Sequence, residues 1–441
     1  MKLPSPPRNV AAPPSHQRTR LLRILLAITV AYGLYWASRF PLEYDDDELP
    51  PSQRPNDGTS MLEPDQLVVS LKTTASDAWS ELLPALVLAD PTTTDTLLLM
   101  SDFQIDIGSS RVEDVLDRYN QSFVSENKEL ERYNRTLAYN TKSINLSALK
   151  ENDPSKERAV LASLDKYKIL RAVERAWELR PERKWYLFAP AHAYLARNNI
   201  YTWLGGLDPE QRTFFADASA ETFVLSQAAI RALMLDHPDA IPRFDTRIAE
   251  QHSARDVLAS VLSSALGLEP SPVRAGVSPF HPATLPFGPE IWCEHVLALA
   301  HTPVDVRSDI WRFERERRDN GLDKDPLLFA DLWDRFLGRE DLENARVGWD
   351  NLSGGKEYVR WGMRGEGRTA ADEGWEACRE ACEGEEGCMQ WAFEERGEGK
   401  CWLSRAMVFG GYGGGEGKRS GWIIERWRGW TRQQRCKSQT G

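Results

Sequence analysis

The chain has 441 residues, enough for about three domains of ordinary size, so it can bury a substantial core without depending on cross-links. It contains 55 Lys plus Arg and 66 Asp plus Glu, and the resulting net charge of −11 argues against a nucleic-acid partner because an acidic surface repels phosphate. With 41% hydrophobic and 27% charged residues, the composition excludes wholesale disorder.

The N-terminal region is basic, unlike the rest of the chain. Residues 1–40 carry six basic residues and no acidic one, and the uncharged 15-residue stretch ILLAITVAYGLYWAS lies between Arg23 and Arg39. Acidic residues follow from Glu43, so the positive-inside rule places the N-terminus in the cytosol. We expect a cytosolic leader (1–20), a signal-anchor helix (21–40) and a stem (41–65). The alternative is a cleaved signal peptide and a secreted protein; both place the body in the secretory lumen.

Sequons and cysteines agree with a lumenal location. Four glycosylation sequons follow the apolar stretch, and they begin at Asn120, Asn134, Asn145 and Asn351. The number of cysteines is even, six, and four of them fall within 24 residues. Such clustering suits an oxidising compartment better than the cytosol.

The pattern after the stem predicts an α/β domain. LVVSL (67–71) and TLLLM (96–100) are short apolar runs typical of buried strands, and the segment SDAWSELLPAL between them has helical spacing. A helix is expected from Asp165 up to Pro181, followed by a strand from Trp185 to Phe188. FVLSQAAIRALML predicts a strand then a helix, and SARDVLASVLSSALGL an amphipathic helix. This alternation favours a largely parallel sheet, with ligands bound where its strands end.

The order of these segments resembles family 31 glycosyltransferases, in the branch of Fringe and the core-1 β1,3-galactosyltransferases. The resemblance covers roughly residues 67–336. It is carried by these segments in order: LVVSLKTTASDAW, LLLMSDFQIDIG, KWYLFAPAHAYL, NIYTWLGGLDP, TFVLSQAAI, ARDVLASVL, and ATLPFGPEIWC with ALAHTPVDV. It implies a Rossmann-like GT-A domain over residues 66–345. It also implies a Golgi single-pass type II membrane protein that transfers a hexose, galactose or N-acetylhexosamine, from a UDP-sugar to a glycan or glycoprotein hydroxyl with inversion.

The sequence departs from the family at the metal site. Members hold Mn²⁺ with acidic side chains after a central strand, and Pro190-Ala191-His192 stands at that place. Proline offers no ligand, and a neutral imidazole does not replace the charge of a carboxylate. The family's glycine-rich turn is replaced by the segment 217–222, whose side chains fill a place meant for close backbone approach. Mn²⁺ binding is therefore the weakest part of the resemblance.

The resemblance assigns roles to six residues. Asp256 would be the base that activates the acceptor, although an Asp at this place also suits a helix cap. His192 and His301 would be surviving metal ligands, the latter only with a one-residue offset. Lys72, Thr73 and Asp102 follow the first two strands and would contact the nucleotide, with Lys72 offsetting phosphate charge. An ordinary turn, core or surface role is the alternative for each.

Residues 346–441 form a second region, rich in Gly, Glu, Arg and cysteine. Cys378, Cys382, Cys388 and Cys401 resemble the framework of a PAN or apple-like module, which implies the pairs Cys378–Cys401 and Cys382–Cys388. A zinc site is the alternative, but the segment holds no C-x2-C and no histidine. Cys293 and Cys436 either pair across the domain boundary or stay free.

Two functions are compatible with this sequence. The first is an active transferase with a UDP-sugar donor. The second is a catalytically silent relative, tethered to the membrane, that holds glycans or a partner transferase through the old cleft or the cysteine module. The lost acidic motif separates the two only in part, because metal-independent transferases exist.

Overall fold

The computed structural model describes residues 61–89, 95–138, 146–217, 221–272, 276–322, 325–342, 344–363, 367–413, 415–434 and 436. The expected leader, the signal-anchor stretch and most of the stem lie outside these residues. Within them, no helix combines the length and the apolar character that crossing a bilayer requires.

The core of the α/β part is an eight-stranded mixed sheet in the order β3-β4-β2-β1-β5-β8-β7-β9. Its strands are β1 (Leu67–Lys72), β2 (Leu97–Ser101), β3 (Ile105–Ile107), β4 (Ser110–Asp114), β5 (Trp185–Pro190), β7 (Phe214–Ala216), β8 (Phe223–Ser226) and β9 (Ser271–Pro272). Strands β4, β2, β1 and β5 are parallel neighbours, whereas β8 runs antiparallel to β5 and to β7. The α/β class expected from the sequence is confirmed, with a sheet that is only partly parallel.

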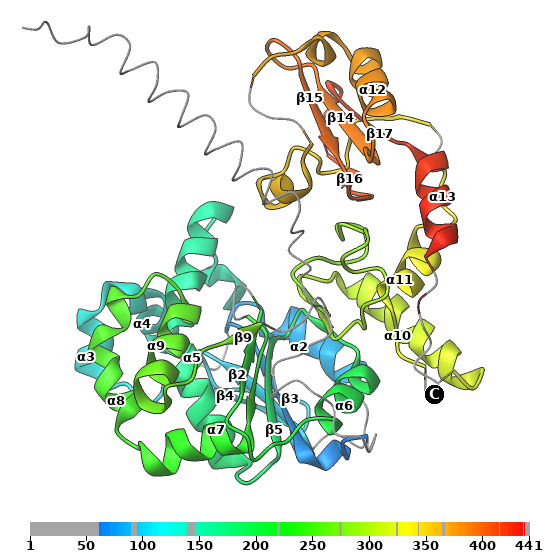
Figure 1. Cartoon of the computed structure of the whole chain (residues 1–441). Helices are drawn as coiled ribbons and strands as arrows, with labels where there is room; N and C mark the ends of the chain where they lie inside the picture. The colour runs from blue at the N-terminus through cyan, green and yellow to red at the C-terminus, as the bar shows by residue number, and fades with distance from the viewer. Residues whose placement is uncertain are drawn as a thin grey trace, which may run out of the picture. The chain divides into compact units, whose positions relative to one another are not determined.

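Helices cover both faces of this sheet, with α3, α4, α5, α8 and α9 on one side and α2 and α6 on the other (Figure 1). Their bounds are α2 (Ala78–Val87), α3 (Gln121–Glu126), α4 (Glu131–Ala138), α5 (Pro154–Leu179), α6 (Arg197–Gly205), α7 (Gln227–Arg231), α8 (Ala240–Phe244) and α9 (Ala254–Leu266). The expected helix before Pro181 begins earlier than predicted, at Pro154, after an Asp153 cap whose side chain accepts from Ser155 N–H.

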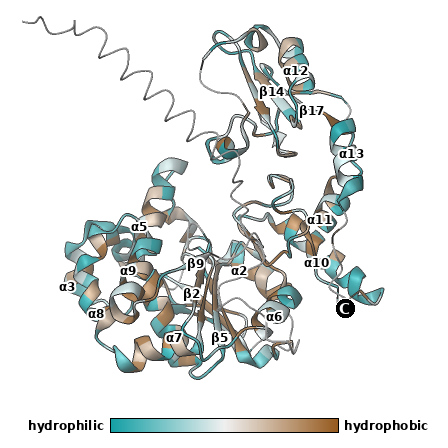
Figure 2. Ribbon diagram, in the orientation of Figure 1, coloured by the Kyte–Doolittle hydropathy of each residue, from teal (hydrophilic) through white to brown (hydrophobic). Residues whose placement is uncertain are grey.

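Alternation along the strands separates two hydrophobic cores. Val68, Tyr186 and Phe188 point into the core beneath α5 and α9, whereas Leu67 and Trp185 belong to the core beneath α2 and α6. Successive side chains of a strand point to opposite faces, so strands buried on both sides read as continuous apolar runs. Figure 2 shows these strands as the hydrophobic centre of the α/β part.

The chain after β9 adds two strands, β10 (Val277–Ser278) and β11 (Ala298–Leu299), which form a small sheet with the earlier strand β6 (Tyr194–Leu195). Two helices follow, α10 (Val304–Asp319) and α11 (Phe329–Phe336). Phe287 and Met407 exchange backbone hydrogen bonds at 2.9 and 2.8 Å, and both belong to one hydrophobic cluster with Trp333 and Trp427. This cluster therefore takes residues from both sides of the predicted boundary at residue 346.

The cysteine-rich region contains a four-stranded antiparallel sheet in the order β12-β17-β14-β15. Its elements are β12 (Arg346–Val347), β13 (Trp349–Asp350), α12 (Trp375–Gly384), β14 (Gln390–Glu394), β15 (Lys400–Ser404), β16 (Gly411–Tyr412), β17 (Lys418–Trp422) and α13 (Ile424–Gln433). Two disulfides, Cys378–Cys401 and Cys382–Cys388, fasten α12, as the resemblance implied. Cys293 pairs with Cys436, which settles the alternative that the sequence left open.

Candidate functional site

Ionisable side chains gather where the central strands end. We call Lys72, Asp165, Lys168, His192, Glu221, His301 and Arg307 the charged cluster. Lys72 ends β1, His192 follows β5, and Asp165 and Lys168 both lie on α5, Lys168 buried and Asp165 partly exposed. The carboxyl ends of parallel strands are where open α/β sheets bind their ligands, which makes this cluster the candidate site.

Lys72 lacks a direct carboxylate partner. Its Nζ lies 5.5 Å from the ring centroid of Phe223, and within the described residues no carboxylate lies within 4 Å of it. Burial lowers the pKa of Lys72, while the more distant carboxylates of Asp165 and Glu221 act against that change. A half-buried ammonium without a paired anion carries an electrostatic cost that a bound anion would remove.

Arg307 is a second cation without an ion pair in the described part of the chain. It is 3% exposed; its Nη1 donates to the backbone oxygen of Ala191 at 2.7 Å, and its Nε has no partner. Burial lowers its pKa, although an arginine stays charged at any physiological pH. Ala191 directly precedes His192, so the guanidinium lies beside the loop where the family motif would stand.

Lys168 and Asp165 form the paired portion of the cluster. Lys168 Nζ contacts Asp165 Oδ1 at 2.9 Å and donates to the Thr73 backbone oxygen at 3.2 Å. Burial opposes the charge of Asp165, but Lys168 and Lys72 outweigh it and lower the pKa of this carboxyl. The Asp165 side chain is 46% exposed and the Lys168 side chain only 6%, so the carboxylate faces solvent while the ammonium lies beneath it.

His192 and His301, predicted from distant parts of the sequence, lie together. Their rings stack with centroids 4.6 Å apart, and the backbone N–H of His301 donates to His192 Nδ1 at 3.1 Å. Burial, followed by repulsion from His301, lowers the pKa of His192 to about 4, so its ring is neutral at physiological pH. His301 has a positive φ of 49°, a backbone conformation rare outside glycine and frequent at functional sites.

Glu221 completes this corner of the cluster. Its Oε2 lies 3.4 Å from His301 Nε2, and this contact raises the pKa of His301 and lowers that of Glu221. Both side chains are accessible, 58% for His301 and 39% for Glu221. A carboxylate that orients an exposed imidazole is an arrangement suited to accepting a proton.

These residues do not fit a manganese ion. A neutral imidazole has one N–H and one lone pair, and the His192 lone pair at Nδ1 already accepts from His301. Among the described residues, no three His, Cys, Asp or Glu side chains are grouped so that they could hold a metal. Mn²⁺ prefers oxygen ligands, and the carboxylates of the cluster, Glu221 and Asp165, already contact His301 and Lys168.

Thr73 and Asp102 have structural partners. Thr73 is 5% exposed, and its hydroxyl donates to Glu81 Oε2 at 2.6 Å. Asp102 is 2% exposed, and its Oδ1 accepts from the Ala75 N–H at 2.8 Å. Both residues therefore hold the turn between β1 and α2. Of the three predicted nucleotide contacts, Lys72 is the one whose side chain has no ion pair or hydrogen bond within the described residues.

Asp256 lies in the first turn of α9, and its carboxylate is hydrogen-bonded to Ser253, the residue that caps this helix. The Ser253 hydroxyl donates to Asp256 Oδ2 at 2.9 Å and accepts from the Asp256 N–H at 3.2 Å. This is the helix-capping alternative that the sequence left open. The role of Asp256 as base stays a prediction.

Four members of the cluster were missed by sequence reasoning, namely Asp165, Lys168, Glu221 and Arg307. One signal for two of them was available, because Lys168 and Arg307 fall on the apolar faces of their helices, beside Leu164 and Ile310 respectively. Charged residues are rarely buried without a reason. Glu221 lies in the segment already noted as departing from the family.

The described sequons differ in exposure. Asn120 is exposed and caps α3, and Asn134 is half-buried on α4. Asn351 is fully buried, and its Nδ2 donates to the backbone oxygens of Trp391 and Gly421 at 3.0 and 3.4 Å. The structure thus argues against the glycan expected at Asn351. Asn145 lies outside the described residues.

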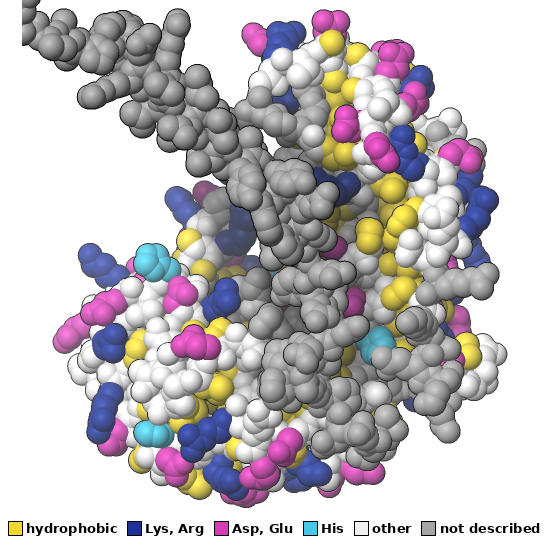
Figure 3. All heavy atoms as spheres, viewed as in Figure 1, with side chains coloured by type: hydrophobic (Ala, Val, Ile, Leu, Met, Phe, Trp, Pro, Cys, Tyr) yellow, Lys and Arg dark blue, Asp and Glu magenta, His cyan; other side chains and the backbone are white. Residues whose placement is uncertain are grey.

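One face of the α/β part is mixed in charge. On the face seen in Figure 3, acidic and basic side chains are interspersed over the described helices of the α/β part.

No known protein-family model matches the chain, and comparison with curated proteins finds no significant relative.

Proposed function

We propose that the charged cluster binds the diphosphate of a UDP-sugar without a metal ion, in a glycosyltransferase-like protein with a GT-A type of domain. The carrying observation is the pair of cations, Lys72 and Arg307, that lack carboxylate partners among the described residues at the carboxyl ends of β1 and β5. Positive side chains aimed at a phosphate stabilise the charge that develops on a diphosphate leaving group.

The reaction that suits these groups is inverting transfer of a hexose to a hydroxyl. The acceptor oxygen attacks the anomeric carbon, the bond from that carbon to the diphosphate oxygen breaks, and UDP leaves with the electron pair. His301 accepts the proton of the acceptor hydroxyl, and Glu221 stabilises the imidazolium that forms. This assignment replaces Asp256 as the proposed base, because the Asp256 carboxylate is hydrogen-bonded to Ser253, the cap of α9.

The cellular setting of the proposal rests on the sequence. The basic leader and apolar stretch favour a Golgi type II anchor, and the three disulfides agree with an oxidising lumen. The acceptor on this proposal is a glycan or glycoprotein hydroxyl.

The proposal is tested by calorimetric titration of the full-length protein with UDP, in EDTA and in Mn²⁺. We expect the same affinity in both buffers, and at least a tenfold loss in Lys72→Met. Lys156→Met is the matched control, because Lys156 is an exposed lysine near the start of α5. Binding that requires Mn²⁺, or no binding at all, would overturn the proposal.

Turnover is measured separately as UDP release from UDP-galactose and UDP-N-acetylhexosamines. The transferase proposal predicts release that depends on His301 and persists in EDTA. UDP binding without release from any donor and acceptor pair would instead support the silent, glycan- or partner-holding alternative.

A further inference from the structure

Asp165 and Lys72 carry opposite charges at the same edge of the sheet and do not pair. Lys72 ends β1 with its Nζ over the Phe223 ring, and Asp165 lies on α5. Among the described residues no carboxylate, Asp165 included, comes within 4 Å of the Lys72 ammonium. Burial lowers the pKa of Lys72 and Asp165 acts against that change, so the two charges are near enough to interact. One ligand can therefore contact both groups.

Lys168 fixes the position of Asp165. Its Nζ contacts Asp165 Oδ1 at 2.9 Å and donates to the backbone oxygen of Thr73, the residue after Lys72, at 3.2 Å. The Lys168 side chain is 6% exposed, so this link between α5 and the end of β1 is buried. A buried cation that bonds both groups holds the carboxylate beside the strand end without help from Lys72.

The other oxygen of Asp165 is available to a ligand. Oδ2 has no hydrogen-bond partner in the described part of the chain, and the Asp165 side chain is 46% exposed. An ionised carboxylate only accepts hydrogen bonds, so it binds N–H and O–H donors. A fully ionised phosphate has no such donor, whereas a sugar hydroxyl has one. A ligand whose phosphate lies at Lys72 would therefore reach Asp165 through hydroxyl groups.

Glu221 is the second carboxylate whose charge acts on Lys72, and it contacts His301 at 3.4 Å. The proposed function places the diphosphate at Lys72 and the acceptor hydroxyl at His301. The Glu221 carboxylate is thus assigned to the end of the site where the hexose is transferred. Asp165 remains for the other end of a UDP-sugar, which is the nucleoside.

We propose that Asp165 accepts hydrogen bonds from the ribose hydroxyls of the nucleotide and makes the site selective for ribonucleotides over 2′-deoxyribonucleotides. The inference rests on the proposed function, because it takes the diphosphate to lie at Lys72. Acidic side chains bind ribose hydroxyls in the same way in other nucleotide-binding α/β folds. Asp165 is on this view a binding residue, and it takes no part in the chemistry.

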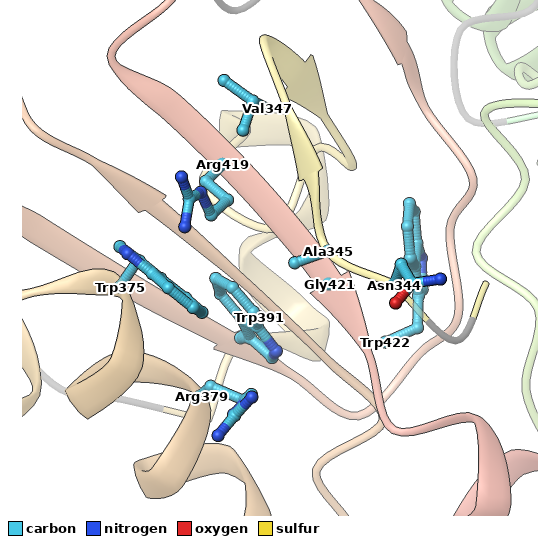
Figure 4. Close-up of a pocket in the computed structure, with 9 residues that line it drawn as sticks. All are labelled: Asn344, Ala345, Val347, Trp375, Arg379, Trp391, Arg419, Gly421 and Trp422. Atoms are coloured by element: carbon cyan, nitrogen blue, oxygen red, sulfur yellow. The ribbon is translucent and has the colours of Figure 1, made fainter.

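The cysteine-rich sheet offers a nucleotide no comparable site. A cavity of about 360 Å³ lies on it, and none of the described residues that line this cavity is acidic (Figure 4). Two of its indoles, Trp391 and Trp422, are only 1% and 5% exposed. The Arg419 guanidinium covers the third ring, that of Trp375, at 4.1 Å from the centroid. The cavity thus presents neither an open ring to a base nor a carboxylate to a ribose.

The test is calorimetric titration of the full-length protein in EDTA with UDP, 2′-deoxy-UDP and pyrophosphate. We expect UDP to bind at least fivefold more tightly than 2′-deoxy-UDP, because loss of the hydroxyl removes a hydrogen bond to a charged group. A smaller difference would overturn the inference and leave the proposed function standing. If neither UDP nor pyrophosphate binds, the proposed function fails and this inference fails with it.

Variants tie the selectivity to the carboxylate. Asp165→Asn keeps an oxygen for Lys168 but removes the charge, so the preference for UDP over 2′-deoxy-UDP should fall below twofold. Pyrophosphate has no ribose, and its affinity should stay the same or rise, because a negative charge near Lys72 is lost. Asp117→Asn is the matched control and should change none of the three affinities, since Asp117 is 51% exposed and likewise pairs with a cation of α5, Arg175.

Two results with Asp165→Asn would contradict the inference. Equal losses for UDP, 2′-deoxy-UDP and pyrophosphate would assign Asp165 a structural role, and an unchanged preference for UDP would place the ribose elsewhere. The comparison of the two nucleotides in the wild type needs no variant, so it decides the matter even if Asp165→Asn fails to fold.

Discussion

The backbone N–H of His301 donates to Nδ1 of His192 at 3.1 Å, although the two histidines are 109 residues apart in the chain. This bond fixes the neutral form of the His192 ring and uses the lone pair that a metal would need. A hydrogen-bonded histidine pair therefore lies near Lys72 and Arg307, two cations that have no ion pair among the described residues.

The first prediction concerns acid stability. The pKa of His192 is about 4 in the folded chain and about 6.5 when unfolded, so the unfolded state binds more protons between these values. Stability should therefore fall as the pH drops from 6.5 to 4, by at most about 3 kcal/mol from this residue. His192→Gln should reduce the slope of melting temperature against pH in this window. His237→Gln, at an exposed site, is the control, and equal slopes in both variants would contradict the prediction.

The second prediction separates binding from stability at Arg307. Arg307→Met removes a buried unpaired charge and also a hydrogen bond to Ala191, and these changes oppose each other. We expect the free energy of unfolding to stay within about 1 kcal/mol of the wild type, while UDP affinity falls at least tenfold. Arg312→Met on the exposed part of α10 is the control. A variant that loses stability and keeps its UDP affinity would assign Arg307 to structure alone.

The third prediction distinguishes the two roles of Asp256. Asp256→Asn keeps a hydrogen-bond acceptor for Ser253 but removes the carboxylate, so a capping residue should tolerate it and a catalytic base should not. We expect UDP release within threefold of the wild type. Asp256→Ala should cost at most about 1 kcal/mol of stability, because it removes the acceptor that orients the Ser253 cap and a negative charge near the helix N-terminus. A drop of a hundredfold or more in the asparagine variant would restore Asp256 as the base.

Local pattern predicted the elements of the fold well, and long-range pairing explains what it missed. The strands that begin at Leu67 and Trp185 are continuous apolar runs, a pattern that predicts strands buried on both faces of a sheet, and the structure buries both faces. The antiparallel position of β8 depends on contacts with β5 that no local signal encodes. For the same reason Arg307 could not be placed beside Ala191, because that contact joins residues 116 apart. His192 and His301 were both predicted as site residues only because the resemblance to the glycosyltransferase family named them; no local pattern indicated that their rings stack.

The fourth prediction compares two disulfides of different span. Cys293–Cys436 closes a separation of 143 residues and Cys382–Cys388 one of 6. A disulfide stabilises the folded state by lowering the entropy of the unfolded chain, and it does so more when it closes a longer loop. The expected stabilisation is about 5 kcal/mol for the first bond and about 2 kcal/mol for the second. Chemical denaturation should therefore show a larger loss in the free energy of unfolding for the double variant Cys293→Ser/Cys436→Ser than for Cys382→Ser/Cys388→Ser. The reverse order would mean that local packing around α12 outweighs chain entropy.

The last prediction concerns glycan occupancy at Asn120 and Asn351. Asn120 is exposed, whereas both Nδ2 hydrogen bonds of Asn351 go to backbone oxygens of a buried sheet, and its Oδ1 accepts from Ser353 at 2.9 Å. A glycan on Asn351 would remove a buried hydrogen bond and would require space that the packed sheet does not provide. Enzymatic deglycosylation converts a modified Asn to Asp, so peptide mass spectrometry of the secreted or membrane-derived protein reads each site directly. We expect conversion at Asn120 and none at Asn351. Conversion at Asn351 would contradict the buried hydrogen bonds to Trp391 and Gly421 and would show that this sheet opens in the cell.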